Sequence, residues 1–82
     1  MINNKNNKTL SSSIEDQLDQ FFEMHAGDCP ESGLYNLVVK EVEKVLIKKT
    51  LSYVDGVQVK ASRILGINRN TLRKKMQEFN ID

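Results

Sequence analysis

Apolar residues recur at helical spacing in the first third of the chain, among positions that are mostly acidic or polar. The spacing is i, i+4, i+7, i+8 and i+11, and the residues are Ile14, Leu18, Phe21, Phe22 and His25. It predicts an amphipathic helix over about residues 12–26, which Gly27 ends. Ser12 and Glu15 fit a capping box at its start. The Asn- and Lys-rich residues before it have too little apolar content to fold, so we expect residues 1–11 to form a flexible tail.

A longer segment without Gly or Pro follows the turn-forming residues 28–33. Two neighbouring apolar stripes run along it. One stripe holds Leu34, Leu37, Val38, Val42 and Val45, and the other holds Tyr35, Val39, Val42, Leu46 and Tyr53. Its β-branched residues would also suit a strand, but its length exceeds that of almost all strands, so we predict a helix over about residues 32–54. A helix that rests on one surface needs only one stripe, so the second stripe favours coverage by another copy of the chain.

The length of the chain also favours a partner subunit. Eighty-two residues make one small domain, and such a domain buries only about 60% of its unfolded surface. A single Cys removes an intrachain disulfide as a source of stability. We therefore expect residues 12–55 to dimerise. The predicted interface consists of Ile14, Leu18, Phe21, Phe22, Leu34, Val38, Val42, Val45 and Leu46.

The last part of the chain, residues 56–82, predicts two short helices at about residues 57–65 and 68–79. Gly66 and Ile67 separate them, and so tight a connection makes the helices cross steeply, as in a helix-turn-helix. Gly66 can adopt the positive φ that such a turn requires, and Asn68 is a good N-cap. The apolar contacts expected between the two helices come from Ala61, Leu65, Ile67, Leu72 and Met76.

Charge changes sign along the chain, although the net charge is only +1. Residues 9–46 carry eight acidic and two basic residues, whereas residues 57–82 carry six basic and two acidic residues. The positions of the last helix that face away from its apolar stripe are Arg69, Asn70, Arg73, Lys74 and Gln77. A helix fits the DNA major groove, Arg can donate two hydrogen bonds to guanine, and cations neutralise phosphates. We therefore predict binding to double-stranded DNA.

Other interpretations of this region exist. A basic helix is often only a solvated face, but a solvated face does not account for the Gly turn, the N-cap and the change in charge sign. A helical protein-interaction module without DNA binding is the alternative from another class. It predicts no steep salt dependence of DNA binding, which a DNA-binding protein must have.

The most specific motif of the chain resembles the recognition segment of the Fis family of helix-turn-helix proteins. This motif is Gly66-Ile67-Asn68-Arg69-Asn70-Thr71-Leu72-Arg73-Lys74-Lys75. Leu34-Tyr35 followed by Glu41-Val42-Glu43 resembles the long second helix of that family. The same domain ends NtrC-type response regulators. The resemblance covers about residues 12–82 and implies an all-α, four-helix subunit. It further implies an intertwined homodimer whose recognition helices lie closer together than one DNA turn, so that the DNA must bend.

The resemblance also implies which residues contact DNA. The family's positions fall on Asn68, Arg69, Thr71, Arg73 and Lys74. Our predicted set adds Asn70, on the outward face, and Lys75, which borders the apolar stripe. Arg69 is expected to read base edges, while Arg73, Lys74 and Lys75 meet phosphates. Val57 and Val59 stand where Fis has polar residues that approach phosphate, so those contacts are not expected.

Other chemistry is not expected. His25 and Cys29 make at most half a zinc site, and no phosphate-binding loop or Ser-His-Asp set is present, so we predict no metal, no cofactor and no enzyme activity. The longest apolar run has three residues, far fewer than the roughly 20 that a membrane helix needs. We expect a cytoplasmic, nucleoid-associated transcription regulator of Fis type, with RNA polymerase as a further candidate partner. The alternative is the DNA-binding domain of an NtrC-type activator.

Overall fold

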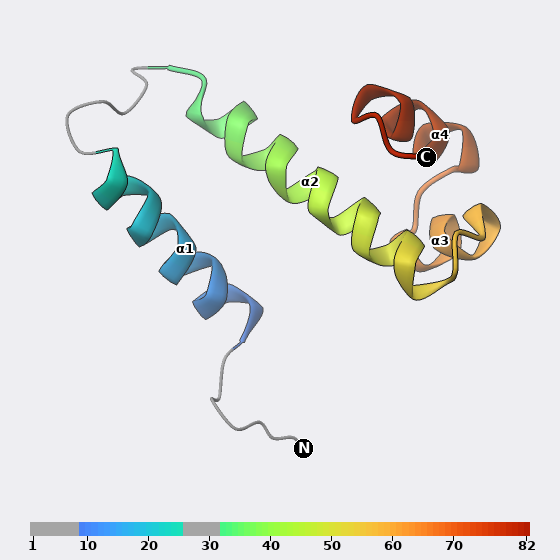
Figure 1. Ribbon diagram of the computed structural model, residues 1–82, viewed down its shortest axis with the longest axis horizontal. Coiled ribbons are helices and arrows are strands. Elements are labelled where there is room, and N and C mark those ends of the chain that lie inside the picture. Colours follow the sequence, from blue (N-terminus) through green and yellow to red (C-terminus); the bar gives the residue numbers. More distant parts are fainter. Residues whose placement is uncertain (1–8, 26–31) are drawn as a thin grey trace. The chain divides into compact units, whose positions relative to one another are not determined.

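The computed structural model describes residues 9–25 and 32–82. These residues form four helices, α1 (Leu10–Met24), α2 (Leu34–Tyr53), α3 (Gln58–Leu65) and α4 (Arg69–Glu78), and no strand within the described ranges (Figure 1). The predicted all-α, four-helix class is therefore confirmed. The chain divides into two compact units, residues 1–31 and residues 32–82, which are described separately below.

Helix α1 begins at Leu10, earlier than the start at about residue 12 that we predicted from the sequence. Thr9 is the N-cap: its hydroxyl accepts a hydrogen bond from the Ser12 backbone N–H at 3.0 Å, and the Ser12 hydroxyl accepts one from the Thr9 N–H at 3.0 Å. The predicted capping box of Ser12 and Glu15 is wrong, because Ser12 instead takes the third helical position of a box that Thr9 opens. Leu10 and Ser11 consequently belong to the helix and not to the predicted tail. Residues 1–8 lie outside the described residues.

The end of α1 is closed by a histidine. His25 occupies the C-cap, and its Nδ1 lies 2.8 Å from the carbonyl oxygen of Phe21. The imidazole also stacks on the Phe21 ring, with ring centroids 4.2 Å apart. Both observations describe a packed, capping histidine. The predicted stop at Gly27 and the thiol of Cys29 lie outside the described residues.

Three helices of the second unit end in the same type of C-terminal turn. After α2, Asp55 adopts φ 55°, and the Gly56 N–H donates to Leu51 O at 2.8 Å. After α4, Asn80 adopts φ 56°, and the Ile81 N–H donates to Met76 O at 2.8 Å. These are Schellman motifs, which satisfy the last helical carbonyls and turn the chain sharply.

The Schellman motif between α3 and α4 uses the predicted glycine. Gly66 has φ 74°, and the next N–H, of Ile67, donates to Ser62 O at 3.1 Å. This turn folds Ile67 back against the core. The predicted tight connection of a helix-turn-helix is therefore present.

Replacing this glycine tests the backbone requirement. We expect Gly66→Ala to lower the free energy of unfolding by about 1–2 kcal/mol, because an L side chain is strained at positive φ. A Cβ built at Gly66 meets nothing within 4 Å, so the cost is one of backbone conformation alone. Gly66→Asn should cost less, since Asn tolerates this region. Urea denaturation measures both; equal losses for Ala and Asn would contradict this explanation.

The core of the second unit is small and joins all three of its helices. The buried residues are Ile47, Leu51, Ala61, Leu72 and Met76, and Val54, Leu65, Ile67, Phe79 and Ile81 pack against them. The predicted contacts between α3 and α4 all lie in this cluster. The contribution of α2 to this core was not predicted, because both predicted stripes lie on other faces of the helix. Ile47, Leu51 and Val54 nevertheless follow helical spacing (i, i+4, i+7).

Those two predicted stripes of α2 are largely exposed in the single chain. Val42, Val45 and Leu46 keep about half of their accessible surface (49%, 52% and 51%), while Leu34 and Val38 are half-buried. In α1, Ile14 and Phe22 are exposed, whereas Leu18 and Phe21 are half-buried. Within the second unit, α2 thus packs its Ile47–Leu51 face on α3 and α4, and these two helices leave a second apolar face of α2 uncovered.

Candidate nucleic-acid interface

The orientation of α4 follows from its cap and its two buried side chains. Asn68 is the N-cap, and its side-chain oxygen accepts a hydrogen bond from the Asn70 N–H at 2.7 Å. Leu72 is completely buried and Met76 nearly so, and both face the core. Because Arg69, Arg73 and Lys74 lie on the remaining arc of the helix, they point to solvent.

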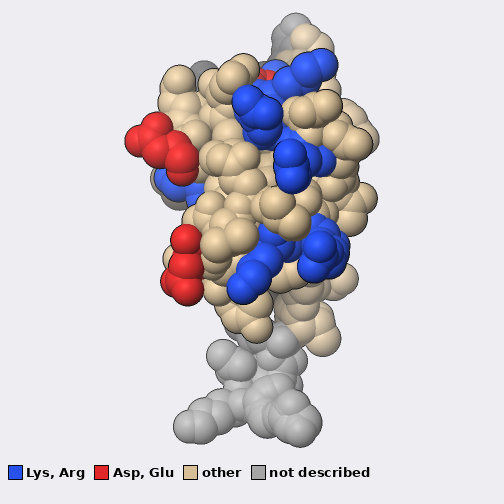
Figure 2. All heavy atoms as spheres, turned by 90° about the vertical axis from the view of Figure 1, so that its right-hand side faces the viewer, with Lys and Arg blue, Asp and Glu red and all other residues tan. Residues whose placement is uncertain are grey.

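The structure places six of the seven predicted contact residues together on exposed positions at the start and outer side of α4. They are Asn68, Arg69, Asn70, Thr71, Arg73 and Lys74. Within the described part of the chain, the side chains of Arg69, Arg73 and Lys74 form no ion pair. Figure 2 shows Lys and Arg side chains gathered on the face formed by α3 and α4, with the visible carboxylates mostly toward one edge. The face therefore presents cations that are not neutralised locally.

A shallow groove runs between the start of α3 and this side of α4. It is lined by Gly56, Val57, Gln58, Val59, Arg69 and Arg73. Val57 and Val59 are both more than 40% exposed. The guanidinium groups of Arg69 and Arg73 thus lie beside the exposed side chains of Val57 and Val59. These two valines occupy the positions at which no phosphate contact is expected.

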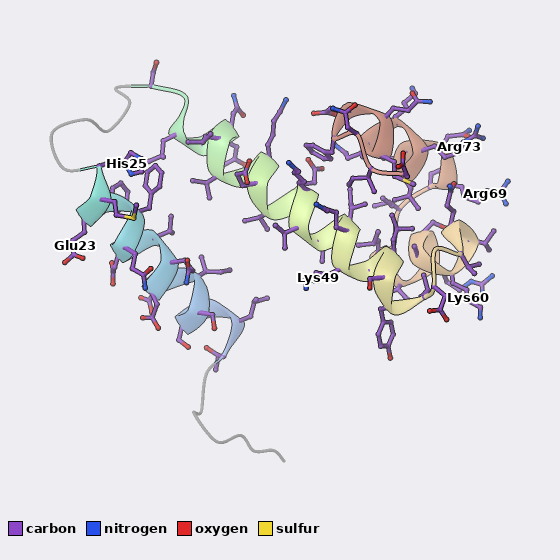
Figure 3. All side chains as sticks on the ribbon, in the orientation of Figure 1. Glu23, His25, Lys49, Lys60, Arg69 and Arg73 are labelled. Carbon is purple, nitrogen blue, oxygen red and sulfur yellow. The ribbon has the colours of Figure 1, made fainter. Side chains whose placement is uncertain are left out.

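Helix α3 adds two cations that the predicted set omits. Lys60 and Arg63 are exposed and lie three residues apart, which places them on neighbouring turns of one side of α3. Figure 3 shows Lys60 on the same side of the unit as Arg69 and Arg73. In the sequence, the i, i+3 spacing of Lys60 and Arg63 could have indicated that they share one side of a helix. Only the structure shows that this helix packs against α4, and so makes both residues candidates for the same basic surface.

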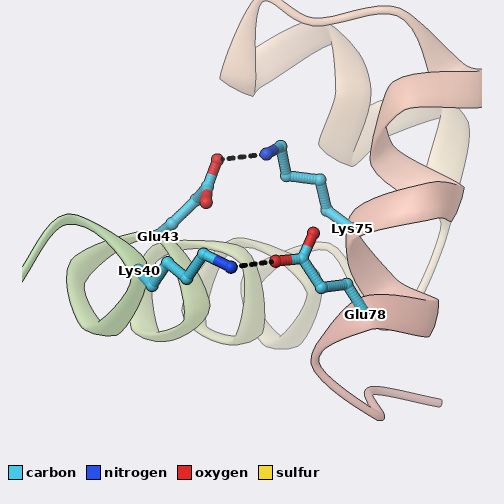
Figure 4. A network of polar contacts seen from close by, with 4 residues as sticks. All are labelled: Lys40, Glu43, Lys75 and Glu78. Atoms are coloured by element: carbon cyan, nitrogen blue, oxygen red, sulfur yellow. Dashed lines mark ion pairs between the residues drawn. The ribbon is translucent and has the colours of Figure 1, made fainter. Parts of the chain in front are cut away.

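Lys75 does not join the other predicted contacts. Its Nζ lies 2.7 Å from Glu43 Oε2 of α2, and its side chain is only 32% exposed (Figure 4). The hydrogen bond to the Glu43 carboxylate raises the pKa of Lys75 above its ordinary value, and the charges of Glu43 and Glu78 add to the effect. Its assignment as a phosphate contact is not supported by this geometry, because the ammonium group is held against α2.

A second ion pair joins the same two helices. Lys40 Nζ of α2 lies 3.2 Å from Glu78 Oε2 of α4 (Figure 4).

Residues 9–25 and 32–82 contain no group of three or more His, Cys, Asp or Glu side chains that could hold a metal ion. None of the described helices is both long enough and apolar enough to span a bilayer.

Comparison with known proteins agrees with this geometry. A family model described as bacterial regulatory protein, Fis family, matches residues 38–79. A putative Fis-like DNA-binding protein of Pseudomonas aeruginosa is 40% identical over 74 residues, which cover 90% of this chain and 70% of that protein. The chain belongs to the Fis family. The resemblance inferred from the recognition segment is confirmed.

Relatives within the family differ greatly in length. The DNA-binding protein Fis of Actinobacillus succinogenes is 37% identical over 73 residues, or 89% of this chain and 73% of that protein. The DNA-binding transcriptional regulator NtrC of Azospirillum brasilense is 46% identical over 72 residues, or 88% of this chain but only 15% of that protein. The chain therefore spans most of its Fis relatives and about one-seventh of its NtrC relatives.

Proposed function

We propose that the chain is a homodimeric regulator of Fis type that binds double-stranded DNA with α4 in the major groove. The observation that carries the proposal is the exposed face of α4, where Arg69, Arg73 and Lys74 have no ion-pair partner among the described residues. The names of the Fis and NtrC relatives support DNA as the ligand. Binding to the chromosome would place the protein in the nucleoid.

The position of each side chain on α4 supports a different role. Arg69 opens the helix, where a helix that enters the groove comes closest to base edges, and its fork can pair with guanine O6 and N7. Asn68, Asn70 and Thr71 lie beside it and supply shorter polar groups. Arg73 and Lys74 are further along and are suited to phosphates. Lys60 and Arg63 would extend the phosphate contacts onto DNA that flanks the site.

Dimerisation is supported by the uncovered apolar face of α2. Val42, Val45 and Leu46 would lose their exposed surface against a second copy, together with Ile14 and Phe22 of α1. A dimer presents two recognition helices, and two helices closer than one DNA turn would require the DNA to bend. Selection of sequences that bend at low cost would then contribute to specificity.

A titration with short duplex DNA at two salt concentrations tests the proposal. Neutralised phosphates release counterions, so we expect affinity to fall steeply as salt rises. A helical protein-interaction module would give weak binding with little salt dependence. That result would reject DNA binding.

The role of Lys74 has its own test. Lys74→Ala should weaken binding to the preferred site and to a scrambled duplex by the same factor, and should lower the slope of log K against log salt by about one unit. Lys48→Ala is the matched control, because Lys48 is an exposed lysine of α2 outside the basic face. An unchanged slope for Lys74→Ala, or an equal change for the control, would contradict the assignment.

A narrower candidate function is that of the DNA-binding domain of an NtrC-type activator. The 46% identity to NtrC over nearly the whole chain favours it. An activating role would add RNA polymerase as a partner. Because the chain spans only about one-seventh of that relative, the activating role itself would depend on parts of such an activator that the matched residues do not cover.

A further inference from the structure

Two consecutive lysines of α4 have different surroundings. Lys74 is exposed and forms no ion pair with a described residue, whereas Lys75 Nζ lies 2.7 Å from Glu43 Oε2 of α2 (Figure 4). The side chains of the Glu43–Lys75 pair are 29% and 32% exposed, less than those of the second pair between these helices, at 61% and 43%. Water and salt screen a partly shielded pair less than an exposed one. Lys75 is therefore the better held of the two lysines that link α2 and α4.

Glu43 is the carboxylate that holds Lys75. Its hydrogen bond is the largest cause that raises the pKa of Lys75, and the charge of Glu78 adds a smaller contribution. The Glu78 carboxylate already has a cation beside it, because its Oε2 lies 3.2 Å from Lys40 Nζ. Without the charge of Glu43, Lys75 would therefore have no carboxylate of its own.

Lys75 lies on a side of α4 from which its ammonium group can reach DNA. It follows Thr71 by four residues, which places the two on neighbouring turns of one side of the helix. Thr71 is exposed and belongs to the predicted contact set. Lysine carries its charge at the end of a flexible four-carbon stem. Once released from Glu43, the ammonium group can turn from α2 toward a phosphate near Thr71.

We propose that Glu43 withholds Lys75 from the DNA backbone and so limits the number of phosphates that each protomer neutralises. The Glu43 carboxylate and a phosphate compete for the same ammonium group. Each neutralised phosphate strengthens binding to every duplex and steepens its dependence on salt. Glu43 thus limits the sequence-independent part of binding and leaves base contacts by Arg69 unchanged. This inference rests on the proposed function.

A cycle of uncharged substitutions separates withholding from long-range repulsion of DNA. Glu43→Gln keeps the size of the side chain and removes its charge, and Lys75→Gln removes the ammonium group. The unmodified protein, both single variants and the double variant are titrated with the preferred site and with a scrambled duplex at several salt concentrations. Glu41→Gln is the matched control, because Glu41 is an exposed glutamate of α2 that forms no ion pair with a described residue.

Glu43→Gln should strengthen binding to both duplexes by about three- to fivefold, a modest gain because exposed ion pairs are weak. The slope of log K against log salt should become steeper by about one unit. Lys75→Gln should leave the slope of the unmodified protein unchanged, but should remove the gained unit when it is added to Glu43→Gln. Glu41→Gln should leave the slope unchanged.

Two outcomes of the cycle would overturn the proposal. One is an equal effect of Glu43→Gln and Glu41→Gln, and the other is the same loss from Lys75→Gln in both backgrounds. In either case the residues act as independent charges. If the unmodified protein binds neither duplex, the proposed function fails as well, whereas an additive cycle alone leaves DNA binding intact.

Nitrogen NMR of the lysine ammonium groups gives a second readout. In the unmodified protein, DNA should shift the signal of Lys74 and leave that of Lys75 in place. In Glu43→Gln, DNA should shift both signals. A shift of the Lys75 signal in the unmodified complex would show that Glu43 does not withhold it, and would overturn the proposal.

Discussion

Val42→Asp is expected to convert the proposed dimer to monomers. Val42 belongs to both apolar stripes of α2 and is 49% exposed in the single chain. In a dimer that covers this face, the new carboxylate would be buried without a partner, which costs about 3–5 kcal/mol. Sedimentation equilibrium measures the change directly, and circular dichroism shows whether the helices remain.

Ile64→Asp is the matched control for this variant. Ile64 is an equally apolar residue of α3, is 57% exposed and lies outside the predicted interface. We expect this variant to remain dimeric at concentrations where Val42→Asp is monomeric. A folded, dimeric Val42→Asp protein would show that the interface lies elsewhere on the chain.

Arg69→Ala should weaken binding to the preferred DNA site by about 1–3 kcal/mol and reduce discrimination against other sequences. The guanidinium group is the one best placed to donate two hydrogen bonds to a base edge, because it stands in the first turn of α4. Affinities for the preferred site and for single-base variants of it, measured at one salt concentration, give both quantities.

Arg69→Lys provides the sharper comparison. Lysine keeps the charge but loses the planar fork, so we expect the salt slope to stay unchanged while discrimination falls. If Arg69→Ala and Lys74→Ala instead lose equal affinity on all duplexes and change the slope equally, Arg69 contacts phosphate and does not read bases.

The sequence predicted α4 and its turn well because the relevant signals are local. Gly66 and Asn68 set the turn and the cap within a few residues, and the spacing of Leu72 and Met76 identifies the buried side. The exposure of Arg69, Arg73 and Lys74 then follows from helical periodicity alone. The N-cap of α1 was also a local feature, but three serines and a threonine stand close together there, and the pattern favoured Ser12 over Thr9.

Contacts between helices could not be predicted in this way. Helix α2 is apolar around much of its circumference, so periodicity did not separate the Ile47–Leu51 face, which meets α3 and α4, from the face assigned to a second copy. In the sequence, nothing distinguishes Lys75 from the neighbouring cations Arg73 and Lys74. Only the crossing of α4 over α2 places Glu43 within 2.7 Å of it and takes its charge away from the exposed face.

A footprint on duplexes selected from a random-sequence pool tests most directly whether two copies of α4 act together on DNA. We expect a complex with two protomers and two symmetry-related protected segments, whose centres lie closer than one helical turn of about 34 Å. A single protected segment occupied by one protomer, or no protection at low salt, would contradict the account.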